Sequence, residues 1–136
     1  MRIRSNKGMT LIEIMVAAAV FVIGLAALLS GLLSAVYFVD NSRDTTIAVS
    51  DLRTMMEHIR STAFNDLTTD FPNTVQDGPG GNNYSAIVGG YTLRNEHITV
   101  TYTNPAADPL EINVSLTWQD KRGRPYSSSM STYMTR

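Results

Sequence analysis

The sequence predicts an α+β protein in which one long amino-terminal helix packs on a small antiparallel sheet. Three observations predict this fold. Residues 14–39 form an uncharged, largely apolar run of 26 residues. Apolar residues then recur at steps of three and four up to Ala63, which is the spacing of one helix face. In the last third of the chain apolar and polar residues alternate, as they do in strands that bury one face.

Composition limits the function classes that need to be considered. The chain has 136 residues, which suffices for one compact domain of ordinary size but not for two. Its net charge of -1 provides no overall basic field that would recruit nucleic acid. There is no cysteine, which excludes disulfides, thiolate nucleophiles and cysteine-based zinc or iron–sulfur sites.

The apolar run is long enough to cross a membrane. As a helix it would rise about 39 Å at about 1.5 Å per residue, more than the roughly 30 Å of a hydrocarbon core. The residues before it include Arg2, Arg4 and Lys7 and no acid, so they form a positive flank. Because such flanks stay cytoplasmic, we expect the chain after Asp40 to lie on the far side of the membrane.

Two plainer interpretations of this segment compete. A cleaved secretory signal would use the small residues of Gly24-Leu25-Ala26, but the chain stays apolar through Val39 and Glu13 interrupts what should be an uncharged region. A simple signal anchor explains everything except Glu13. On that interpretation the carboxylate reaches the headgroups from the end of the helix.

The residues around this carboxylate form a specific motif, which reads Lys7-Gly8-Met9-Thr10-Leu11-Ile12-Glu13. It resembles the leader junction of the type IV pilin superfamily, the bacterial class III signal. In that family a short basic leader ends in Gly, and a hydrophobic residue and a Thr-Leu-Ile-Glu core then begin a long apolar helix. The resemblance covers about the first 40 residues. Met9 stands where the family usually has Phe, and Ser30-Gly31 where many major pilins have Pro.

The resemblance implies a processing and assembly site. A prepilin peptidase would remove residues 1–8 by cutting between Gly8 and Met9, and the new amino group of Met9 would be N-methylated. In a fibre that amine can meet the Glu13 carboxylate of a neighbouring subunit. At low dielectric the pair is favoured over two separated charges, and it sets the axial register of the subunits. A snorkelling carboxylate remains the alternative.

Residues 9–39 would form the membrane and assembly half of the helix, and residues 40–64 its amphipathic half, giving one helix of about 50 residues. We expect polar residues such as Asp44, Asp51 and His58 to point in the other directions. Met55 and Met56 are expected to fill the core. The predicted apolar stripe consists of Ala48, Leu52, Met55, Met56, Ile59 and Ala63.

Residues 65–90 are rich in Gly, Pro and Asn and predict a loop region with little regular structure. This region offers oxygen ligands of the kind that calcium takes, but no EF-hand spacing is present. Solvated turn residues are therefore the default expectation, and a structural calcium ion is the alternative. The candidates are Asp66, Asp70, Asp77 and Asn82.

Residues 91–136 predict an antiparallel β-meander. Ile98, Val100 and Tyr102 share one face, and the even-numbered residues 110–118 share the buried face of the next strand. A turn at residues 119–125 precedes a third strand over residues 126–134, and residues 91–93 are an optional extension of the sheet. The basic residues of this turn are Lys121, Arg122 and Arg124, which we expect to be solvated, with a DNA or partner contact as the alternative.

Nothing in the sequence predicts catalysis. His58 and His97 have no metal-spaced partner, and no nucleophile elbow, phosphate-binding glycine loop or zinc-protease string occurs. The cluster at residues 78–81 lacks the lysine and helix that bind phosphate. We therefore expect no enzymatic activity, no cofactor and no metal.

The leading functional hypothesis is a minor pilin, resembling the PilV-like group, that primes or modifies a type IV pilus. A minor pseudopilin of a type II secretion system shares the same features, and a membrane-anchored binding domain that never assembles is the third hypothesis. The expected partners are other pilins, prepilin peptidase, the inner-membrane assembly platform and membrane lipid, with no nucleic acid. The protein would cross the inner membrane once, with a periplasmic carboxy-terminal domain, before joining a surface pilus or a periplasmic pseudopilus.

Overall fold

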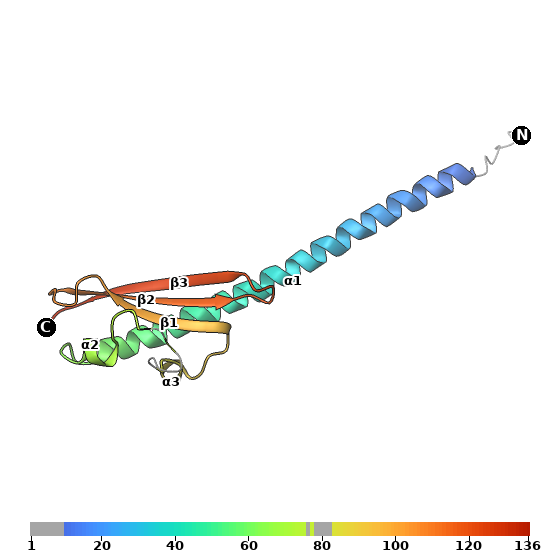
Figure 1. Cartoon of the computed structure of the whole chain (residues 1–136). Coiled ribbons are helices and arrows are strands. Elements are labelled where there is room, and N and C mark those ends of the chain that lie inside the picture. The colour runs from blue at the N-terminus through green and yellow to red at the C-terminus, as the bar shows by residue number, and fades with distance from the viewer. Residues whose placement is uncertain (1–9, 76, 78–82) are drawn as a thin grey trace, which may run out of the picture. The chain divides into compact units, whose positions relative to one another are not determined.

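A computed structural model describes residues 10–75, 77 and 83–136. Helix α1 (Leu11–Ser61) is followed by the short helices α2 (Leu67–Asp70) and α3 (Ser85–Val88) and by three strands (Figure 1). The strands are β1 (Arg94–Tyr102), β2 (Leu110–Gln119) and β3 (Pro125–Met134). The chain divides into two units, Met1–Asp40 and Asn41–Arg136, which are described in turn.

The described part of the first unit is helical from Leu11 onward, and every residue from 11 to 39 is exposed. Apart from Tyr133, all large exposed hydrophobic side chains of the described chain lie on this segment. By length and composition the helix can cross a membrane. The prediction of one helix of about 50 residues is confirmed, because α1 has 51.

In the second unit, the part of α1 after Asn41 packs on one face of the sheet. Its buried residues are Ala48, Leu52, Met55, Met56 and Ile59, which recur at steps of three and four. Both methionines are core residues, as predicted. The stripe was predicted to reach Ala63, which is wrong: α1 ends at Ser61, and Ala63 is exposed beyond it.

The strands form an antiparallel sheet in the order β1-β2-β3, which confirms the predicted meander. β2 and β3 pair without a shift from Leu110 opposite Met134 to Gln119 opposite Pro125. The face toward α1 carries the predicted apolar residues of β1 and β2, all of them buried. On β3 only Thr132 is buried, while Tyr126, Met130 and Met134 are half-buried against the core.

The sheet does not include residues 91–93, which were an optional extension of the predicted meander. β1 begins at Arg94, and its register with β2 shifts between Arg94 and His97. At this bulge Asn95 has a φ of 49°, in the left-handed region that Asn tolerates. Glu96 Oε2 accepts the N–H groups of Thr92 and Leu93 at 3.1 and 2.9 Å. These amides are therefore bonded to a side chain instead of to a strand.

The region predicted as a loop contains the two helical turns α2 and α3, and it covers one end of the core. Leu67, Phe71 and Tyr84 are buried there, and the rings of Phe71 and Tyr84 stack at 6.0 Å. The Tyr102 hydroxyl lies 2.7 Å from the Phe71 carbonyl and 3.1 Å from that of Leu67. Burial raises the pKa of Tyr102 above its ordinary value.

The change Tyr102→Phe tests this buried contact. We expect it to lower the free energy of unfolding by about 1–3 kcal/mol, because the Phe71 carbonyl loses a buried donor. Chemical unfolding of the full chain in detergent can be followed by the fluorescence of Trp118, the only tryptophan. Tyr133→Phe is the matched control, because its hydroxyl donates to an exposed Glu111 carboxylate. Equal losses of unfolding free energy in Tyr102→Phe and Tyr133→Phe would contradict a stabilising buried hydrogen bond from Tyr102.

Candidate functional site

Glu13 takes part in a reciprocal cap at the start of α1. The Thr10 N–H donates to Glu13 Oε2 and the Glu13 N–H to Thr10 Oγ1, each at 3.4 Å. This is the arrangement of a capping box, which supplies acceptors for amides that have no helical partner. Sequence reasoning weighed Glu13 only as a charge, although the Thr-x-x-Glu spacing at residues 10–13 was the available signal.

The cap leaves Glu13 open to a second group. The side chain is exposed on the first turn of α1, where the helix dipole also favours an acid. Only Oε2 is used by Thr10, so the carboxylate can accept a further hydrogen bond or pair with a cation from outside the chain.

The other residues of the predicted processing site lie outside the described residues. They are the leader cations Arg2, Arg4 and Lys7 and the junction Gly8 and Met9. Their roles and the pairing of Glu13 with an amine therefore remain predictions.

The apolar surface that follows Glu13 is far larger than soluble proteins tolerate. Leu11 is 76% exposed and Phe38 79% exposed, and the apolar side chains between them are exposed on all sides of the helix. Burying each such side chain is favourable by about 1.5–3 kcal/mol. A contiguous surface of this extent requires a membrane or a bundle of other helices.

A second polar feature joins α1 to β1 inside the second unit. Glu96 is only 3% exposed, because it shares the inward face of β1 with Ile98, and Asp51 of α1 is half-buried beside it. Glu96 Oε1 and Asp51 Oδ2 are buried and have no hydrogen-bond partner among the described residues. A proton held between the two carboxyl groups would satisfy both atoms.

Burial raises the pKa of both carboxyl groups. For Glu96 the N–H groups of Leu93 and Thr92 lower the pKa in part, whereas the nearby Asp51 charge raises it further. For Asp51 the neighbouring Glu96 carboxyl group partly offsets the effect of burial on the pKa. The sequence prediction placed Asp51 outside the apolar stripe, and the structure finds it half-buried on the flank of α1. Helix periodicity alone could not show that Glu96 of β1 lies beside this flank.

The candidate metal ligands do not converge. No group of three His, Cys, Asp or Glu residues that could hold a metal occurs in the part of the chain that the structure describes. Asp66 and Asp70 are exposed, and Asn82 lies outside the described residues. Asp77 corrects the expectation of solvated turn residues, because it is 6% exposed and its Oδ1 accepts the Tyr84 N–H at 3.4 Å.

The two histidines and the basic turn lie at the surface. His58 and His97 are exposed, and the His58 ring meets Phe71 edge-on at 6.0 Å. Asp120 Oδ1 accepts the N–H groups of Arg122 and Arg124 at 2.8 and 2.9 Å, and its Oδ2 pairs with Arg124 Nε at 2.7 Å. The basic residues thus belong to a tight β2–β3 turn, as predicted.

Comparison with known proteins bears on the amino-terminal segment. The profile of the prokaryotic N-terminal methylation motif matches residues 3–29, which include the predicted junction, Glu13 and the first half of the apolar run. No curated protein and no solved structure matches the chain significantly.

Proposed function

We propose that this chain, which is type IV pilin-like in its fold and begins with a class III signal, is a minor pilin that primes or modifies a type IV pilus. One combination of features carries the proposal. The methylation motif heads an apolar helix whose residues 11–39 are all exposed, and a compact sheet domain follows it. Proteins of this kind are structural subunits and not, in general, enzymes.

The class III signal implies processing by prepilin peptidase. On our proposal the enzyme cuts between Gly8 and Met9 and the Met9 amine is methylated, while the leader cations Arg2, Arg4 and Lys7 keep the leader on the cytoplasmic side. The apolar helix is consistent with an inner-membrane anchor before assembly. The assembly platform, other pilins and membrane lipid are the further proposed partners.

Glu13 is the proposed assembly residue. Its carboxylate neutralises the Met9 amine of a neighbouring subunit, and pairing the two charges in an apolar bundle avoids leaving either one alone at low dielectric. The capping box supports this role, because it holds the carboxylate at the first turn of α1 while one oxygen stays open.

Cleavage is tested by the mass of the mature protein in its own cells. We expect it to start at methylated Met9, and we expect Gly8→Trp to accumulate as a larger precursor, because a peptidase site that ends in Gly accepts only a small side chain. Gly8→Ala is the matched control and should be processed nearly as well as the wild-type chain. A mature protein that starts at Met1 would overturn the proposal.

The location of the processed protein separates the pilin role from its alternatives. A minor pilin should be found in sheared pili. A processed chain that stays in the membrane, and whose deletion blocks protein secretion, would instead be a minor pseudopilin of a type II secretion system. A processed chain found only in membranes, without that secretion defect, would be an anchored domain that does not assemble.

A further inference from the structure

Strand β3 is an edge strand without the usual protection against pairing. It is ten residues long, contains no charged residue, has Pro only at its first position and pairs with β2 without a bulge. Edge strands in soluble proteins are normally short, charged, bulged or interrupted by Pro. In an antiparallel pair every second residue directs its N–H and C=O away from its neighbour strand. No backbone hydrogen bond to these outward groups occurs among the described residues.

The opposite edge of the sheet is protected. β1 has the bulge between Arg94 and His97 and carries charged residues beside it. Its outer side is also occupied by the loop before α3: the Thr74 N–H donates to the Val100 carbonyl at 2.9 Å, and Asn73 Oδ1 accepts the Tyr102 N–H at 3.0 Å. The contrast identifies β3 as the edge left open for another strand.

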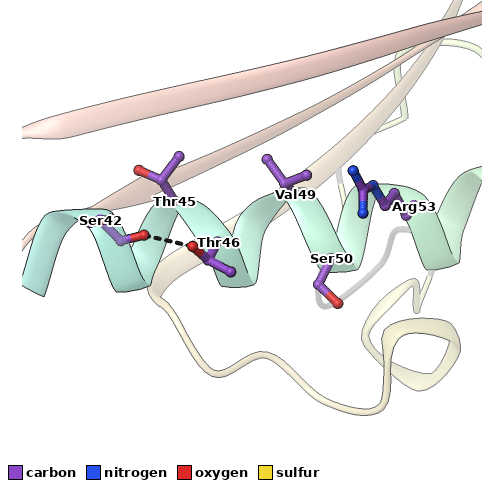
Figure 2. A pocket seen from close by; sticks show the side chains of 6 residues that line it. All are labelled: Ser42, Thr45, Thr46, Val49, Ser50 and Arg53. Atoms are coloured by element: carbon purple, nitrogen blue, oxygen red, sulfur yellow. Dashed lines mark hydrogen bonds between the residues drawn. The ribbon is translucent and has the colours of Figure 1, made fainter.

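The flank of α1 beside β3 is also uncovered. The Arg60 guanidinium donates to Thr132 Oγ1 of β3 at 3.0 Å, so this flank of the helix faces β3. Two turns earlier on the same flank lies a groove of about 630 Å³, with Arg53 at one end (Figure 2). Arg53 has no ion pair or hydrogen bond to any residue that the structure describes. The groove is lined by Ser42, Thr45, Thr46, Val49, Ser50 and Arg53.

The composition of β3 disfavours a second copy as its partner. Arg53 lies on the flank of α1 beside this edge and has no ionic partner among the described residues, so a strand that fits here should carry an acid. β3 of another copy contains no charged residue and cannot supply one. β1 of another copy is blocked on its outer side by the loop before α3.

We propose that the free edge of β3 binds an extended segment of a different subunit, which adds a fourth strand to the sheet and places a carboxylate on Arg53. The unpaired backbone of β3 supplies the hydrogen bonds, as in other cases of strand addition. The groove accepts the partner's inward side chains, and the unpartnered Arg53 supplies the charge preference. The identification of the partner as another subunit rests on the proposed function.

The test uses the full chain in its own cells, with a photo-crosslinking amino acid at Ser129 or Ser131 on the exposed face of β3. Thr117 is the control position, because it is exposed on the central strand β2. We expect adducts from the β3 positions and none from Thr117. In the purified complex, β3 amides should exchange at least tenfold more slowly than in the detergent-solubilised chain alone.

Two substitutions test the chemistry of the edge. Ser128→Lys places a charge on the half-buried face of β3 and should lower the adduct yield at least fivefold, whereas Thr117→Lys should not. Arg53→Gln should lower the yield at least threefold, whereas Arg43→Gln, an exposed cation on another side of α1, should not. Trp118 fluorescence confirms that each variant is folded.

The outcomes separate this proposal from the proposed function. An adduct that joins two copies, equal adducts from Thr117 and Ser129, or unchanged exchange of the β3 amides would overturn strand addition by a different subunit. An unchanged yield with Arg53→Gln would overturn the carboxylate contact. The mass of the mature amino terminus, measured on the same samples, reports processing independently. A correctly processed chain without β3 adducts would therefore refute only the edge proposal.

Discussion

Glu13→Gln is expected to leave the amount of protein in the membrane unchanged and to lower its amount in sheared pili at least tenfold. The change removes the charge that would neutralise the Met9 amine of a neighbour, and an unpaired charge in an apolar bundle costs several kcal/mol in the buried limit. A tenfold loss corresponds to only about 1.4 kcal/mol. Gln can still accept the Thr10 N–H, because capping boxes use Glu or Gln at this position.

Glu13→Ala completes this comparison, because it removes both the charge and the acceptor that Glu13 offers to the Thr10 N–H. If the charge pairs between subunits, Gln and Ala should be equally defective. If Glu13 matters only through the capping box, Gln should assemble normally and Ala poorly. If the carboxylate merely snorkels, both variants should insert and assemble as well as the wild-type chain. Cleavage must be checked in each sample, so that a processing defect is not read as an assembly defect.

Glu96→Gln is expected to stabilise the folded protein at neutral pH by about 1 kcal/mol. Gln can still accept the N–H groups of Thr92 and Leu93, and its amide can donate to the unpartnered Asp51 Oδ2. Glu96→Ala should have the opposite effect at every pH. It leaves these two amides without their acceptor, which costs about 1–3 kcal/mol for each buried group.

The carboxyl pair also predicts how stability depends on pH. Both pKa values are raised in the folded state, so the folded protein binds protons at these two carboxyl groups more tightly than the unfolded chain does. The contribution is fully present below the ordinary carboxyl range, about pH 4, and is lost as the pH rises through the raised values. The wild-type free energy of unfolding should therefore fall from this acid range toward neutral pH more steeply than that of Glu96→Gln.

Chemical unfolding of the full chain in detergent between pH 4 and 8, followed by Trp118 fluorescence, measures this dependence. Glu57→Gln is the matched control, because Glu57 is an exposed carboxylate on the same helix. If the wild-type chain and Glu96→Gln have parallel pH profiles, Asp51 and Glu96 do not share a proton. If the pH profile of Glu57→Gln differs from that of the wild-type chain as much as the profile of Glu96→Gln does, the effect comes from net charge alone.

Periodicity predicted most of the fold because it depends on local geometry. Residues Ala48 to Ile59 recur at helical spacing and residues Leu110 to Trp118 at strand spacing, and each pattern suits one buried face. Periodicity did not predict where each element ends. Ala63 continues the helical spacing but lies beyond the last turn, and residues 91–93 alternate as a strand would although Glu96 binds the amides of Thr92 and Leu93.

The sequence by itself determined that this protein has a long helix, uncharged over residues 14–39, with a methylation motif at its head and strands of an antiparallel sheet after it, because these features depend on residues close together in the chain. Only the tertiary structure decided that Asp51 meets Glu96, that Asp77 is buried and that β3 has an open edge. These relations join residues far apart in the chain through the packing of α1 on the sheet and through loops that cover Asp77 and the edge of β1. Such contacts and bulges arise when faces are packed together, so no local pattern of residues specifies them.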